Sequence, residues 1–294
     1  MPFISKKRLE LESSIRTMAA AFKKKRIFDE AIKCHYEILQ KIFLTNPLYF
    51  KTIFKANRFI IGSAILGLYY TRKESTFKDI KKFCIANDLL SSNSLDSFLL
   101  YLRVGGRIEV YKDASDKRKF NYKPTTKTLV ETKKMINTML IPCAMLSTDF
   151  DLAFYQNHQN FVPAFFKHYS EITLNRIFIH YMVPGSADFL SRDGGHMIMF
   201  NLFLESIKQN TLDVHYNLLK ASFSCGVSRS HIKRCLQAAE QHQLLTIVDN
   251  KHIVSLTPEF MMMVKDYFAL YLASIKHGFN GMRAEEVIFN SQIN

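Results

Sequence analysis

The sequence contains few of the residues that interrupt regular structure. Only ten Gly and seven Pro occur among 294 residues, which predicts few long loops. The longest apolar run, residues 59–70, is too short to span a bilayer and contains Gly62 and Gly67. A basic stretch at residues 6–8 leads into mixed polar sequence, without the apolar segment of a signal peptide. We therefore expect a soluble, cytoplasmic protein with no membrane partner.

Patterns that would indicate catalysis or metal binding are also missing. The five cysteines are an odd number, lie far apart and form no Cys-x-x-Cys pair, so we expect reduced and mostly buried thiols. The sequence has no nucleophile elbow, P-loop or His-Glu-x-x-His motif. Gly194 and Gly195 are too short a glycine run to hold a phosphate. We expect no enzyme activity, no cofactor and no metal.

Positive charge is abundant but uneven. Residues 1–140 contain 28 Lys or Arg and 13 Asp or Glu, so their balance is 28 − 13 = +15. Residues 141–294 contain 12 and 13, which gives 12 − 13 = −1. A basic half of this size suggests a polyanionic partner, although a solubilising surface would have the same composition.

Apolar periodicity predicts a mostly helical chain with two short hairpins. Hydrophobic residues make up 48% of the sequence, including 25 Phe and 13 Tyr, which is enough for packed cores. Helices are expected over residues 5–43 (one or two helices), 48–72, 77–86, 91–104, 125–146, 161–182, 197–209, 212–223, 228–241 and 258–276. Strands are expected over residues 107–112, 119–123, 244–248 and 252–256.

The second half of the chain repeats the order of the first. An offset of 137 pairs Leu95 with Ile232 and Leu99 with Leu236, and it falls to 134 at Pro124, which pairs with Pro258. The repeat of helices followed by a hairpin predicts tandem winged helix-turn-helix units arranged as a pseudo-dimer. The expected domains are an N-terminal helical extension (1–45), a first winged-helix domain (46–146), a helical linker (147–195), a second winged-helix domain (196–276) and a C-terminal tail (277–294).

A helix-turn-helix unit places its second helix in the DNA major groove, which admits one α-helix. Such a helix needs an apolar inner face and a polar outer face, and residues 228–241 fit this description. Arg can bond to two acceptors on guanine, while Ser and Lys can contact phosphates. The candidate DNA-binding residues on the two helices are Ser92, Asn93, Ser97, Ser228, Arg229, Ser230, Lys233 and Arg234. Asp96 would repel phosphate unless it meets the amino group of a cytosine.

The first hairpin supplies a second candidate contact. Its tip contains Lys117, Arg118 and Lys119, and Lys112 lies on the preceding strand. A basic tip can enter a narrow A/T-rich minor groove, which attracts Arg. We expect Asp116 to hold the turn in shape.

At these residues the chain resembles the MarR family of bacterial transcription regulators. That family has Asp-x-Arg in its wing, as Asp116 and Arg118 here, followed by a strand that ends near Thr125. Residues 254–259 and 225–232 resemble its strand-to-helix junction and the start of its recognition helix. The resemblance implies a DNA-binding repressor or activator, tuned by a small molecule in a cleft between helices. Six aromatic residues could line such a cleft, although at helical spacing such residues more often form ordinary core: Phe161, Phe165, Phe166, Tyr169, Phe178 and Tyr181.

Two features depart from the family pattern. MarR proteins carry one such unit per chain and dimerise, whereas two units are fused here, so the chain is either a monomeric pseudo-dimer or a homodimer. The second turn has only Asp249, Asn250 and Lys251 in place of Asp-x-Arg. Two other functions stay open, namely a plasmid replication initiator with two winged helices and a winged-helix scaffold that binds proteins.

Overall fold

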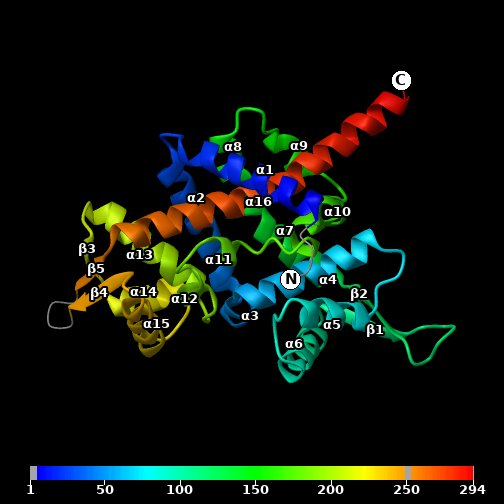
Figure 1. Cartoon of the computed structure of the whole chain (residues 1–294), viewed down its shortest axis with the longest axis horizontal. Helices are drawn as coiled ribbons and strands as arrows, with labels where there is room; N and C mark the ends of the chain where they lie inside the picture. The colour runs from blue at the N-terminus through cyan, green and yellow to red at the C-terminus, as the bar shows by residue number, and fades with distance from the viewer. Residues whose placement is uncertain (1–4, 249–252, 294) are drawn as a thin grey trace.

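The computed structural model describes residues 5–248 and 253–293. The chain is mostly helical with small antiparallel sheets, as expected (Figure 1). The first elements are α1 (Lys6–Lys23), α2 (Phe28–Thr45), α3 (Pro47–Ile53), α4 (Ala56–Thr71), α5 (Phe77–Ala86), α6 (Ser92–Val104), β1 (Ile108–Lys112), β2 (Phe120–Pro124), α7 (Thr126–Asn137) and α8 (Leu140–Leu146). The others are α9 (Leu152–Asn157), α10 (Phe161–Leu174), α11 (Ile179–Met182), α12 (Ala187–Leu190), α13 (Gly195–Gln209), β3 (Asp213–His215), α14 (Leu218–Cys225), α15 (Arg229–Gln241), β4 (Leu245–Val248), β5 (Ile253–Leu256) and α16 (Pro258–Ile293).

Two segments share one order of elements. In the first unit, which we define as residues 56–124, α4 is followed by α5, α6, β1 and β2. In the second unit, residues 195–256, α13 is followed by β3, α14, α15, β4 and β5. Thr76, just before α5, bridges Asn121 of β2, at the place where β3 pairs with β5 in the second unit. The strands are therefore arranged in the same order in both units.

Each hairpin packs one face against its own helices. Tyr122 of β2 pairs with Val110 of β1, and its buried hydroxyl donates to the carbonyl oxygen of Ile65 in α4 at 2.8 Å. In the second unit Leu245 pairs with Leu256, and both side chains are buried. The turn expected at residues 249–251 lies outside the described residues.

Side-chain caps explain where the helices of the units begin. Thr76 and Asp79 form a reciprocal capping box at the start of α5. Ser91 caps α6, Ser228 caps α15, and the hydroxyl of Thr257 accepts from an amide in the first turn of α16. Each such cap contributes about 1 kcal/mol to helix stability.

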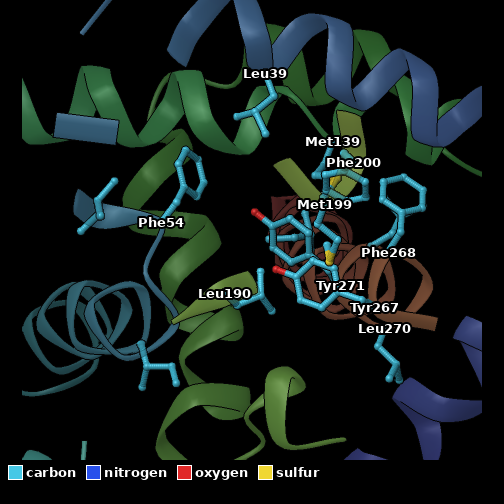
Figure 2. Close-up of a cluster of buried hydrophobic side chains, with 14 of the residues drawn as sticks. Leu39, Phe54, Met139, Leu190, Met199, Phe200, Tyr267, Phe268, Leu270 and Tyr271 are labelled. Carbon is cyan, nitrogen blue, oxygen red and sulfur yellow. The ribbon is translucent and has the colours of Figure 1, made fainter. Parts of the chain in front are cut away.

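The units share one core, through which α16 runs as a long central helix packed against α1 and α10. Figure 2 shows Phe200 of α13 beside Phe268 and Tyr271 of α16, and the ring centroids of Phe200 and Phe268 are 6.1 Å apart. Close crossing of α4 and α10 depends on Gly67, because a Cβ there would lie 2.8 Å from Ser170 Cβ. Buried residues from all these segments belong to one hydrophobic cluster. This shared core does not separate the chain at the predicted domain boundaries, which stay a prediction.

The predicted C-terminal tail (277–294) begins as a packed helix. Helix α16 continues to Ile293, and Phe279 is fully buried. Gly278 and Gly281 suggest a helix end in the sequence, yet they mark close packing in the structure. A Cβ at Gly278 would lie 2.5 Å from the ring of Phe165, so only glycine lets α16 approach α10 this closely.

Several expected helices are divided, and one begins as a strand. The segments 48–72, 125–146 and 161–182 each form two helices. After α10, Arg176 has a φ of 62°, a left-handed conformation that a helix cannot contain. Residues 213–215 form β3 because only Val214 is buried and its neighbours are exposed. An alternation over three residues is too short to be distinguished from a helix in sequence.

Candidate nucleic-acid interface

Helix α15 has the two-faced character expected of it. Ile232, Cys235 and Leu236 are buried against the second unit, and the Ser228 hydroxyl accepts a hydrogen bond from the amide of His231 at 3.2 Å. The opposite face contains the predicted residues, all of which are exposed: Ser228, Arg229, Ser230, Lys233 and Arg234. Within the described residues none of its three cations forms an ion pair, so they are free to bind an anion.

Helix α6 presents a different surface. Ser92, Asn93 and Ser97 are exposed as predicted. Asp96 forms an ion pair with Lys81 of α5 at 2.7 Å, which offsets part of its negative charge, and the expected repulsion of phosphate stays a prediction. Beyond these residues the outer face of α6 becomes apolar, with Leu100 and Val104 exposed by 57% and 79%.

The turn of the first hairpin is held by its two aspartates. Oδ1 of Asp113 accepts from the amides of Ser115 and Asp116 at 2.9 and 3.1 Å, and its Oδ2 accepts from Asn121. Hydrogen bonds from Ser115 and Asn121 lower the pKa of Asp113, which keeps it ionised. Asp116 Oδ1 accepts from the amide of Arg118 at 2.9 Å, so the expected role of Asp116 in shaping the turn is confirmed.

The predicted hairpin cations differ in their availability. Lys112, Lys117 and Arg118 are exposed and have no ion pair in the part of the chain that the structure describes. Lys119 instead pairs with Glu74, which raises the pKa of this lysine, and lies 3.9 Å from Asp113. Lys119 is thus partly neutralised and is the weakest of the predicted hairpin contacts.

Two exposed lysines on α5, Lys78 and Lys82, extend this basic surface and were not among the predicted contacts. Their position in the sequence could have indicated them as phosphate contacts, because α5 is the first helix of the expected helix-turn-helix. In that motif the first helix crosses the DNA backbone.

The candidate surfaces lie along one edge of the molecule. Figure 1 shows α6 and α15 at the same edge, with the β1–β2 hairpin and the β4–β5 pair towards opposite ends. The turn between α1 and α2, which exposes Lys24, Lys25 and Arg26, lies at the opposite edge. In this view the candidate residues of both units are therefore on the side away from that turn.

An apolar cavity of about 70 Å³ lies between the first unit and the central helices. Three of the aromatic residues suggested for a cleft, Phe165, Phe166 and Tyr169, line it. Phe178 lines a neighbouring cavity of about 50 Å³. Phe161 is buried against Phe165 instead, and Tyr181 is exposed by 62%, so the cleft residues are only partly brought together.

Across residues 5–248 and 253–293 no group of three or more His, Cys, Asp or Glu side chains could hold a metal ion. In the same residues no helix combines the length and apolarity needed to cross a membrane. The sequence matches no family model, and neither the curated proteins nor the solved structures contain a significant match.

Proposed function

We propose that this chain is a sequence-specific, double-stranded DNA-binding transcription regulator, built from two winged helix-turn-helix units in one polypeptide and resembling the MarR family. The observation that carries the proposal is α15, an exposed helix that begins with a Ser cap and presents Arg229, Lys233 and Arg234 without ion pairs to the described residues. An α-helix fits the major groove, and Arg is the commonest reader of guanine there.

The element order and charge of the units support this function. In a winged helix the β-hairpin follows the recognition helix and reaches the backbone or the minor groove. The first hairpin offers Lys117 and Arg118 at its tip, and Lys78 and Lys82 on α5 lie where the first helix of the motif meets phosphates. The central helices would take the place of a subunit interface, so that one chain acts as a pseudo-dimer.

The direct test is titration of the full-length protein with duplex DNA at several salt concentrations. Replacing Lys117 and Arg118 with Ala should reduce the slope of log affinity against log salt by about two units, since each phosphate contact contributes roughly 0.9. The matched control removes Lys24 and Lys25 from the opposite edge and should leave the slope unchanged. No binding to any duplex at low salt would refute the proposal.

A protein-binding scaffold is the second candidate, and one observation favours it for the first unit. Ile85, Leu100 and Val104 are exposed by 71%, 57% and 79%, and such residues are poor partners for DNA. If the protein binds no DNA, these side chains are the first to test for a protein partner. A plasmid replication initiator would bind DNA too, but beside tandem repeats and not at an inverted repeat in a promoter.

Ligand control is part of the proposal. The cavity beside Phe165 also touches Leu102 of α6 and Ile108 of β1, so a molecule held there would contact the first unit and the central helices together. Its lining is apolar, but the cavity has about half the roughly 150 Å³ of a cavity that binds benzene. A small aromatic compound would therefore have to enlarge it, which would bias the orientation of α6 relative to α10.

A further inference from the structure

The two recognition helices of the proposed function are not equivalent. Their capping serines, Ser91 and Ser228, are 137 residues apart, which aligns α6 and α15 position by position. At three exposed positions α15 carries a cation where α6 carries none: Arg229 against Ser92, Lys233 against Asp96, and Arg234 against Ser97. Farther along, Gln237 and Gln241 of α15 correspond to Leu100 and Val104 of α6. Helix α15 therefore carries cations in its first turns, where α6 has none, whereas the single cation of α6, Arg103, lies in its last turn.

The groups suited to phosphates are distributed in the opposite way. In the first unit, five exposed cations form no ion pair with the described residues: Lys112, Lys117 and Arg118 on the hairpin, and Lys78 and Lys82 on α5. The second hairpin, residues 245–256, contains one Lys and one Asp in sequence. Helix α14 has a single cation, Lys220, and it pairs with Glu205 at 3.6 Å.

We infer that the DNA site of this protein is asymmetric, with one half read in the major groove by α15 and the other half held through its backbone and minor groove by the first unit. The inference rests on the proposed function and specifies its ligand. Because both units belong to one chain, the two halves always have the same order along the DNA. The protein would therefore bind in a single orientation, unlike a dimer of identical subunits on a palindrome.

The chemistry of each half follows from its contacts. Arg229 and Arg234 would select guanines, because an arginine can donate two hydrogen bonds to O6 and N7 of that base. The hairpin tip with Lys117 and Arg118 would favour a narrow A/T-rich minor groove, where negative potential is strongest. For α6 and α15 to meet the same face of a duplex, the two halves should be one helical turn, or a multiple of one turn, apart, as in paired helix-turn-helix units.

The experiment is selection of duplexes from a random pool by the full-length protein, followed by affinity measurements on the selected site. We expect one G-containing half with strong base preferences, and an A/T-rich half at a fixed side. Arg229→Ala should reduce the ratio of specific to non-specific affinity about 5- to 150-fold, the range for one bidentate Arg–guanine contact. Lys117→Ala with Arg118→Ala should weaken binding to all duplexes and should also remove the A/T preference of the other half.

A gain-of-function variant tests the same idea from the other side. Ser92→Arg with Ser97→Arg gives α6 the two arginines of α15 and keeps the Asp96–Lys81 pair. Selection with this variant should yield base preferences in both halves.

The outcomes separate the two proposals. A palindromic motif with equal halves in the native protein would overturn the asymmetric site and leave DNA binding intact. Preferences that survive Arg229→Ala with Lys233→Ala would overturn the reading role of α15. Absence of binding to every duplex would refute the proposed function itself.

Discussion

Arg107 and Glu131 form a buried ion pair in which Nε and Nη2 of the guanidinium donate to the two carboxylate oxygens at 2.8 and 2.9 Å. The Arg107 and Glu131 side chains are only 6% and 14% exposed. The guanidinium carbon also lies 3.6 Å from the ring centroid of Tyr49. Because Arg107 precedes β1 and Glu131 lies in α7, the pair joins the first hairpin to the central helices beside the cavity.

Breaking this pair on one side should destabilise the protein strongly. Glu131→Ala leaves the Arg107 charge buried without its partner, a change that typically costs about 3–5 kcal/mol. Chemical denaturation monitored by circular dichroism would measure the loss in the free energy of unfolding.

The control for that variant removes both charges together. Arg107→Met with Glu131→Leu should lose less stability than Glu131→Ala, because no buried charge remains. If the double variant is the less stable of the two, packing on Tyr49 and not charge pairing dominates at this position.

Acid should weaken the central core through two buried histidines. Burial lowers the pKa of His35 to about 4 and that of His196 to about 3, whereas an unfolded chain titrates them near 6.5. A folded pKa below the unfolded value means that stability is complete above pH 6.5 and falls as the pH drops towards 4. Each histidine should cost roughly 2 kcal/mol between pH 7 and pH 5. His196→Phe should reduce this pH dependence, and an unchanged dependence would assign it to other groups.

The close packing of α16 on α10 can be tested with single methyl groups. Gly278→Ala places a Cβ 2.5 Å from the Phe165 ring and should cost about 1–3 kcal/mol of stability. Asn280→Ala, at an exposed position of the same helix, should leave stability unchanged or raise it slightly. Equal effects of the two substitutions on the melting temperature would contradict the packing described here.

Ligand binding in the cavity beside Phe165 can be tested through protein stability. A small aromatic compound that binds there should raise the melting temperature of the protein, because it binds only the folded state. Thr132 lines the cavity from α7, so Thr132→Leu should fill part of it and abolish the shift. A shift that persists in the variant would place the compound elsewhere.

Local signals in the sequence were sufficient for the helices and hairpins of the units. Ser91 and Ser228 mark helix starts by hydrogen bonds within one turn, and buried residues such as Leu95 and Ile232 follow the helical period. Long-range contacts were not visible. In the sequence Gly278 suggests the end of a helix. In the structure a glycine is needed there for close packing on the ring of Phe165 of α10, a residue more than a hundred positions away in the sequence.

The candidate site was predictable to a similar extent. The exposure of Arg229 and Lys117 follows from their places on a helix face and at a hairpin tip. The ion pairs of Lys119 with Glu74 and of Asp96 with Lys81 could not be predicted from the sequence, because each depends on how two separate elements pack together.

The last prediction separates the charge of the hairpin from its shape. Asp113→Ala removes a negative charge near the proposed phosphates, which alone would raise affinity for DNA. It also removes the acceptor for the amides of Ser115 and Asp116, and with it the turn that positions Arg118. We expect the loss of shape to dominate and affinity to fall. Glu109→Gln removes the same charge from the same hairpin without touching the turn and releases Lys123 from its pair at 2.9 Å, so affinity should rise. A rise in both variants, measured by titration with the selected duplex, would show that only net charge matters.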